Sequence, residues 1–215
     1  MAFEAKICGL TTPAAVETAI GHGASHIGLV FFAKSPRNIT AEAAGELSRL
    51  AAGKVIRTGL MVDASDEQIA AILAACPLDL LQLHGKETPE RVAEIRQRFG
   101  LPVMKALQIG EAGDLAQARA YEKVADRLLF DAKPPASKTD ALPGGNAVSF
   151  DWSLLAGQQF GIPWMLAGGL TADNLAEAVR ASGARAADTS SGVEDRPGEK
   201  NLQKIKDFLR VAEGL

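Results

Sequence analysis

The sequence is poor in cysteine, and its charges do not cluster. Only two cysteines, Cys8 and Cys76, occur among 215 residues, and neither belongs to a paired motif. Such a chain is typical of a reducing compartment and not of a disulfide-bonded secreted protein. The net charge is −3 and no basic cluster is present, so we expect neither nucleic acid nor an anionic membrane surface as a partner.

Long apolar runs and metal-binding motifs are also missing. No uninterrupted apolar run approaches the roughly 18 residues of a membrane span. The N-terminal stretch MAFEAKICGL lacks the basic start and long apolar segment of a secretory signal. No group of His, Cys, Asp or Glu has metal-ligand spacing. The sequence therefore predicts a cytoplasmic protein without a metal site, whose partner is a small molecule.

Short apolar runs alternate with amphipathic segments along the chain. The runs predict eight strands, at residues 3–8, 26–32, 55–62, 78–84, 101–107, 127–132, 163–169 and 184–190. Strands this apolar are covered on both faces, and helical crossovers between them require parallel pairing. Eight such units predict a single-domain (β/α)8 TIM barrel over residues 1–215. An open doubly wound sheet is the alternative, which the lack of an early GxGxxG fingerprint disfavours.

Capping residues mark several helix starts. Ser65 precedes two acidic residues, Thr88 is followed by Pro89, and Thr171 opens the stretch TADNLAEAV. Each is expected to lie at the beginning of a helix. One connection differs from the rest, because residues 132–149 read AKPPASKTDALPGGNAVS. A long irregular segment of this kind in a compact domain is usually functional or mobile.

In a barrel of this type the active site lies at the carboxyl ends of the strands. Cys8 ends the first strand, and Lys6, on the same face, could stabilise its thiolate. Asp131 ends the sixth strand directly after LLF, so we expect it to be partly desolvated and able to donate a proton near neutral pH. The alternatives are an unreactive buried cysteine, and an aspartate that caps the next loop or pairs with Lys133.

Two strand ends predict a phosphate site. Gly168 and Gly169 follow the seventh strand, and Ser190, Ser191 and Gly192 follow the eighth. Small residues expose backbone N–H groups and hydroxyls to an anion, and the loops after strands seven and eight are the recurrent phosphate position in this fold. Two such loops together favour a phosphate site over ordinary glycine turns, so the substrate is expected to carry a phosphate.

Two further polar residues stand at strand ends. Arg37, in KSPRNIT after the second strand, has a fork of donors that suits a carboxylate, although it could be a solvated loop charge. His84 ends the fourth strand and could bind substrate or donate a hydrogen bond. A lone histidine at such a position is more often structural, so we treat His84 as a secondary candidate.

Six motifs occur in the order and spacing of one known family: KICGLT, GLVFFAKSPRNI, LLQLHG, FDWSLL, LAGGLTADNLAEAV and SSGVEDRPGEKN. Through them the sequence resembles phosphoribosylanthranilate isomerase, of the tryptophan pathway, along essentially its whole length. The resemblance implies a (β/α)8 barrel that performs an Amadori rearrangement without a cofactor. The substrate would be the aminoaldose N-(5-phosphoribosyl)anthranilate, and the product an aminoketose with an opened sugar chain.

The resemblance also implies roles for matching residues. Cys8 would be the general base, Asp131 the general acid, and Arg37 the anchor of the anthranilate carboxylate. Asp188, on the eighth strand, resembles a family position close to the substrate, and the loops at residues 168–169 and 190–192 would hold the phosphate. The chain departs from the family at one place, where GGNAVSFDW stands in place of a GGxGxxF pattern.

Other functions stay open at this point. Another phosphosugar enzyme on the same barrel, such as an epimerase or the histidine-pathway isomerase, would need metal-binding histidines or a pair of aspartates. A cysteine at the end of the first strand counts against both. A non-catalytic barrel that binds a phosphorylated ligand would tolerate loss of Cys8 and Asp131. Both a monomer and a homodimer are compatible with the sequence, because a contact surface on the outer helices resembles any amphipathic face.

Overall fold

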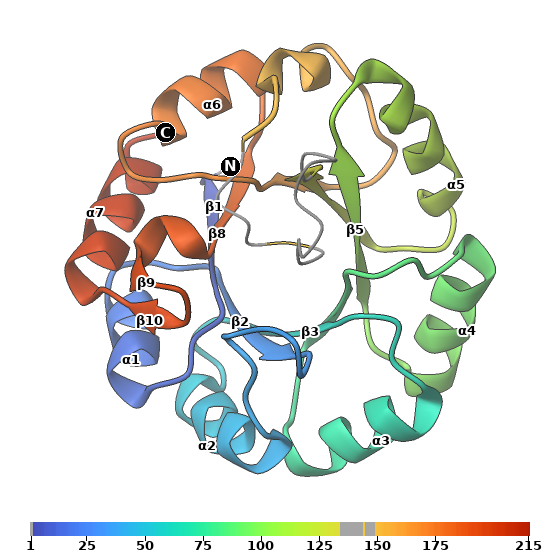
Figure 1. Cartoon of the computed structure of the whole chain (residues 1–215), viewed down its shortest axis with the longest axis vertical. Helices are drawn as coiled ribbons and strands as arrows, with labels where there is room; N and C mark the ends of the chain where they lie inside the picture. The colour runs from blue at the N-terminus through green and yellow to red at the C-terminus, as the bar shows by residue number, and fades with distance from the viewer. Residues whose placement is uncertain (1, 134–143, 145–148) are drawn as a thin grey trace.

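The computed structural model describes residues 2–133, 144 and 149–215, which form a closed barrel of eight parallel strands. Each strand pairs with the next one along the chain, and β8 closes the barrel against β1 (Figure 1). The predicted (β/α)8 barrel is therefore confirmed, with every predicted strand in place. The strands are β1 (Glu4–Cys8), β2 (His26–Phe31), β3 (Ile56–Met61), β4 (Leu80–Leu83), β5 (Val103–Ile109), β6 (Arg127–Ala132), β7 (Trp164–Leu166) and β8 (Ala186–Thr189).

The helices form a ring outside the strands (Figure 1). The α-helices are α1 (Pro13–Gly21), α2 (Ala41–Ala51), α3 (Asp66–Ala75), α4 (Pro89–Phe99), α5 (Ala118–Tyr121), α6 (Leu175–Ser182) and α7 (Leu202–Glu213). Among the described residues, three 3-10 helices accompany them: η1 (Ala112–Gln117), η2 (Trp152–Leu155) and η3 (Ser191–Val193). In the part of the chain that the structure describes, no helix is long and apolar enough to cross a membrane.

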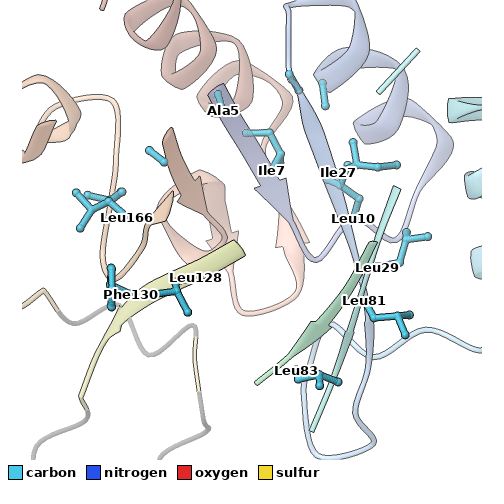
Figure 2. Close-up of a cluster of buried hydrophobic side chains, with 14 of the residues drawn as sticks. Ala5, Ile7, Leu10, Ile27, Leu29, Leu81, Leu83, Leu128, Phe130 and Leu166 are labelled. Atoms are coloured by element: carbon cyan, nitrogen blue, oxygen red, sulfur yellow. The ribbon is translucent and has the colours of Figure 1, made fainter. Parts of the chain in front are cut away.

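Successive strand residues point to opposite faces of the barrel wall. One set packs in the layer between strands and helices, where Ile7, Ile27, Leu81 and Phe130 belong to the main core (Figure 2). The other set faces the barrel interior and forms a separate buried cluster of Leu80, Met104, Ala106, Leu129, Met165, Ala167 and Ala186. Because both faces are buried, the strand sequences are apolar almost throughout.

The predicted helix starts are correct in two cases of three. Ser65 caps α3 in a complete capping box, and Thr88 caps α4 by accepting a hydrogen bond from the backbone N–H three residues on. The start at Thr171 is wrong, because α6 begins at Leu175. The side-chain oxygen of Asn174 instead accepts the Thr171 N–H at 2.8 Å, which forms a turn before the helix.

A small antiparallel hairpin lies outside the barrel, beside α7 (Figure 1), and nothing in the apolar pattern predicted it. It consists of β9 (Glu194–Arg196) and β10 (Glu199–Lys200). Gly198 in its turn has φ +87°, and a Cβ atom there would lie 2.5 Å from the carbonyl oxygen of Pro36. The hairpin therefore approaches the loop after β2 so closely that only glycine fits.

Most of the irregular connection predicted to be functional or mobile lies outside the described residues. Residues 134–143 and 145–148 are not described, and they include Asn146, Ala147 and Val148, where the chain departs from the family pattern. Among the described residues between β6 and β7, η2 stands where other units of the barrel have an α-helix.

Candidate active site

A cavity opens among residues that follow or end the barrel strands. Val30, Phe32, Leu60 and Val62 form an apolar wall on the β2–β3 side. Every site residue predicted from the sequence lines the same cavity: Cys8, Arg37, His84, Asp131, Gly168, Gly169, Asp188, Ser190, Ser191 and Gly192.

Cys8 is the last residue of β1 and is 4% exposed. A Cβ atom added to Gly28 of β2 would lie 2.7 Å from the Cys8 Sγ and 3.1 Å from the Lys6 Nζ, so the thiol and the ammonium share one side of the wall, as predicted. The charge of Lys6 favours the Cys8 thiolate, as expected, but it is not the largest effect on this thiol. Burial raises the pKa of the Cys8 thiol, and the charge of Lys6 opposes this shift without reversing it.

Lys6 forms a buried ion pair with Asp188. Its Nζ donates to the Asp188 Oδ1 at 2.8 Å, and the two residues are neighbours in the β1–β8 register. Burial raises the pKa of the Asp188 carboxyl although Lys6 favours the carboxylate. Burial alone would lower the pKa of Lys6, but Asp188 and Cys8 raise it. The positive charge beside the thiol is thus shared with a carboxylate, which the sequence did not indicate.

Asp131 and His84 face each other from β6 and the end of β4. The Asp131 Oδ2 lies 3.3 Å from the His84 Nε2, and both side chains are buried. The His84 Nδ1 lies 3.0 Å from the Gln82 Nε2. The Gln82 amide therefore helps to orient the ring, and the His84 Nε2 is directed at the Asp131 carboxyl group beside the cavity.

The alternative pairing of Asp131 with Lys133 does not occur. Lys133 instead pairs with Asp114 at 3.0 Å on the surface. A Cβ atom on Gly144 would lie 2.7 Å from both the Asp131 Oδ2 and the His84 Nε2, so this glycine packs directly against the pair. Asp131 is therefore a buried carboxyl group whose described side-chain neighbours belong to the site.

Arg37 is not a solvated loop charge, since it is 4% exposed. Its Nε and Nη2 donate to the two carboxylate oxygens of Glu194, both at 2.8 Å. Burial alone would raise the pKa of Glu194, but the hydrogen bond from Arg37 and the charge of Lys200 lower it below its usual value. The bidentate contact fixes the guanidinium plane at the wall of the cavity.

The two small-residue loops are joined to each other and to β1. Thr189 donates through Oγ1 to the Leu170 carbonyl oxygen at 2.7 Å, which links the loops after β8 and β7. Ser190 donates to the carbonyl oxygen of Cys8 at 3.1 Å, and the Lys200 Nζ donates to the Ser190 carbonyl oxygen at 2.9 Å. The backbone of the predicted phosphate site is thus held in place from three sides.

A metal site is not formed by the described residues, among which no group of three or more His, Cys, Asp or Glu side chains could hold an ion. The reactive groups at the cavity are a thiol, two carboxyl groups and an imidazole. Such a set can move protons between a bound ligand and the protein.

Sequence reasoning missed the buried ions that support the site. Glu194 and Lys200 stand in the motif SSGVEDRPGEKN, of which only the first three residues had been assigned a role. Charged residues in a stretch rich in Pro and Gly are typical of a solvated loop. The sequence pattern therefore did not indicate that Glu194 and Lys200 are buried. Gln82 lies in an otherwise apolar strand, and the strand pattern does not indicate its contact with His84.

Comparison with known proteins decides the family. The family model for N-(5'-phosphoribosyl)anthranilate (PRA) isomerase matches residues 5–211. The chain belongs to the N-(5'-phosphoribosyl)anthranilate isomerase family. It is 58% identical over 214 residues to that isomerase of Paramagnetospirillum magneticum, a match that covers 100% of this chain and 99% of the relative. It is 53% identical over 215 residues to that of Rhodospirillum centenum, with 100% of both chains covered.

Solved structures agree. A phosphoribosyl anthranilate isomerase from Thermotoga maritima superposes with a TM-score of 0.88 at 33% identity, over 100% of both chains. Another isomerase structure, a complex with reduced 1-(o-carboxyphenylamino)-1-deoxyribulose 5-phosphate, has a TM-score of 0.85 at 32% identity and the same coverage. The predicted family and the predicted isomerase activity in tryptophan biosynthesis are therefore confirmed.

Proposed function

We propose that this isomerase converts N-(5'-phosphoribosyl)anthranilate into 1-(2-carboxyphenylamino)-1-deoxyribulose 5-phosphate with Asp131 as the general acid and Cys8 as the general base. The observation that carries the proposal is that the carboxyl group and the thiol line one cavity, together with Arg37 and the two small-residue loops. Residues 1–215 would act as one domain.

The first step opens the sugar ring. Asp131 donates its proton to the furanose oxygen as the bond between that oxygen and C1 breaks. The lone pair of the anthranilate nitrogen forms a C1–N double bond, which leaves a protonated Schiff base. His84, whose Nε2 lies beside the Asp131 carboxyl group, would donate a hydrogen bond to a substrate oxygen.

The second step moves a proton from carbon. The Schiff base makes the hydrogen on C2 acidic, and the Cys8 thiolate removes it. The electrons of the C–H bond form a C1–C2 double bond while the π electrons of the C1–N bond return to the nitrogen. Protonation at C1 and loss of the proton from the C2 hydroxyl then yield the aminoketose. A thiolate in a buried site lacks solvation, and its raised pKa makes it a stronger base once formed.

Two anchors would hold the substrate between acid and base. Arg37 would bind the anthranilate carboxylate, and the loops at Gly168, Gly169 and 190–192 would bind the phosphate. Asp188 lines the cavity on the side of Cys8 and would contact the sugar. Fixing both ends of a substrate places the reacting carbon near the base before reaction and lowers the entropic part of the barrier.

The test is an assay of purified protein without added metal, which follows the loss of anthranilate fluorescence. Asp131→Asn and Cys8→Ser should each lower kcat by about 10² or more, the scale for removing a general acid or base. Complementation of a tryptophan auxotroph by the same variants gives a second readout. Full activity in both variants would refute the assigned roles, and a metal requirement would refute the chemistry.

Location and assembly belong to the same proposal. We expect a cytoplasmic monomer or homodimer that acts on a phosphorylated small molecule, without nucleic acid or membrane as a partner. One solved isomerase, from Thermotoga maritima, is described as dimeric in a study of monomers made from it. Sedimentation of this chain over a range of concentrations distinguishes the two states.

A further inference from the structure

The β9–β10 hairpin carries a buried carboxylate, Glu194, that the proposed chemistry does not use. We infer that Glu194 is a positioning residue that holds the two substrate anchors, Arg37 and the loop at Ser190, in one fixed relation. The inference rests on the proposed function, since that function makes Arg37 the carboxylate anchor and the Ser190 loop part of the phosphate anchor.

The contact to the carboxylate anchor is bidentate. Arg37 donates to both Glu194 oxygens at 2.8 Å, and the two side chains are 5% and 4% exposed. A guanidinium held along one edge by two parallel hydrogen bonds can neither rotate nor tilt freely. Glu194 therefore sets the plane in which Arg37 meets a ligand in the cavity.

The contact to the phosphate anchor runs through Lys200, on the other strand of the hairpin. The Lys200 Nζ lies 2.6 Å from the Glu194 Oε1 and donates to the carbonyl oxygen and the Oγ of Ser190, at 2.9 and 3.2 Å. The Lys200 side chain is 3% exposed. One carboxylate oxygen of Glu194 thus contacts both the cation at the carboxylate anchor and the cation at the phosphate anchor.

The charges explain why a carboxylate is needed at this point. Burial lowers the pKa of Lys200, and the nearby positive charge of Arg37 adds to this effect, while Glu194 counteracts it. Without Glu194 two buried cations would face each other with no counter-charge, and one of them would turn outward or lose its proton. Either response would release an anchor.

The backbone of the hairpin fixes Glu194 against both loops. Gly198 packs on the Pro36 carbonyl group, next to Arg37, so the turn of the hairpin touches the loop after β2. Lys204, from the first turns of α7, donates to the Glu194 carbonyl oxygen at 2.8 Å. The hairpin is therefore a rigid link between the two ends of the cavity, outside the barrel wall.

The experiment uses one probe for each anchor, anthranilate and inorganic phosphate, as inhibitors of the full-length isomerase. Glu194→Gln should raise both inhibition constants on the order of 10-fold, the scale for losing a hydrogen bond to a charged group. It should raise KM more than it lowers kcat, because Glu194 does not touch the reacting atoms. Lys200→Met should raise the inhibition constant for phosphate and leave that for anthranilate within about twofold of the value for the unaltered protein.

The matched control is Asp195→Asn, which removes the same charge from the neighbouring residue of β9. Asp195 pairs with Lys204 at the surface, and the Asp195 side chain is 52% exposed. Glu194→Asp keeps the charge, but the aspartate side chain is too short to reach both cations, so this variant tests the same point if Glu194→Gln does not fold. Its inhibition constants for anthranilate and for phosphate should both rise.

The inference is overturned if a folded Glu194 variant has the same inhibition constants for anthranilate and phosphate as Asp195→Asn. It is also overturned if only one of the two constants rises. Failure of the proposed function looks different, because Asp131→Asn and Cys8→Ser would then keep full activity. Circular dichroism of each variant shows that the barrel is intact.

Discussion

Lys6, Cys8 and Asp188 form a buried group of three ionisable side chains in which the charge of one depends on the other two. Lys6 favours both anions, while the negative charge of Asp188 disfavours the Cys8 thiolate. Because Lys6 is already paired with Asp188, a Cys8 thiolate adds a second negative charge to one buried cation. Protonation of Asp188 would therefore make the thiolate easier to form.

This balance predicts how the pKa of Cys8 responds to its neighbours. Asp188→Asn removes a negative charge and should lower the pKa, whereas Lys6→Met should raise it further. The thiolate is the form that reacts with iodoacetamide, so the pH profile of alkylation should move to lower pH in the first variant and to higher pH in the second.

The measurement is made in a Cys76→Ala background, so that Cys8 is the single reacting thiol. The double variant, Lys6→Met with Asp188→Asn, controls for altered packing and should fall between the two single variants. A profile that stays in place in Asp188→Asn would contradict the charge coupling, and so would a shift to higher pH.

At the scale of single elements, the loop after β4 is held by a buried ion pair that brackets His84. Lys105 donates to the carbonyl oxygens of Leu83 and Gly85, at 3.3 and 2.8 Å, and pairs with Glu87 at 2.8 Å. Glu87 in turn accepts the backbone N–H of Gly85. The residues on both sides of His84 are therefore fixed from β5.

We expect that removing one partner of this pair costs far more than removing both. Lys105→Met leaves the Glu87 carboxylate buried and unpaired, which should lower the free energy of unfolding by about 3–5 kcal/mol. The double variant, Lys105→Met with Glu87→Gln, should recover part of that loss. Urea unfolding of Lys105→Met, Glu87→Gln and the double variant at one pH gives the comparison. A loss in the double variant equal to the sum of the two single losses would show that the pair is not coupled.

The starts of helices and the positions of strands were predictable where neighbouring residues in the sequence determine them. Ser65 and Thr88 each satisfy a backbone donor three residues on, so their chemistry is complete within one turn. Thr171 misled because Asn174, three residues later, competes for the same turn. The β9–β10 hairpin had no apolar pattern to reveal it, since charged side chains buried by long-range pairing hold it.

For the molecule as a whole, the barrel was predictable because closure buries both faces of every strand and leaves a run of apolar residues for each. The position of the site followed from the fold, as Cys8, Asp131 and Arg37 could be assigned to strand ends. The pairing of Lys6 with Asp188, and of Arg37 with Glu194, joins residues 182 and 157 positions apart. No local pattern encodes such contacts.

His26, at the start of β2, gives the whole barrel a dependence on pH. It is 1% exposed, and burial together with the charge of Arg127 lowers its pKa to about 4. An unfolded chain binds a proton at the ordinary value of about 6.5, while the folded protein keeps His26 neutral until pH 4. The unfolded state thus binds more protons between these values, and stability falls as the pH falls from about 6.5 to 4.

The shift corresponds to about 3 kcal/mol of unfolding free energy across that window, at about 1.4 kcal/mol per pKa unit. His26→Gln should abolish this part of the decline, whatever its effect on stability at pH 7. Urea unfolding at a series of pH values measures the slope, and His22→Gln, at an exposed position, is the matched control that should keep it. Carboxylates with lowered pKa values, such as Asp79, lose their contribution to stability mainly below this window, so they do not account for the slope. If the stability of His26→Gln falls as steeply as that of the unaltered protein between pH 6.5 and 4, the prediction for His26 is wrong.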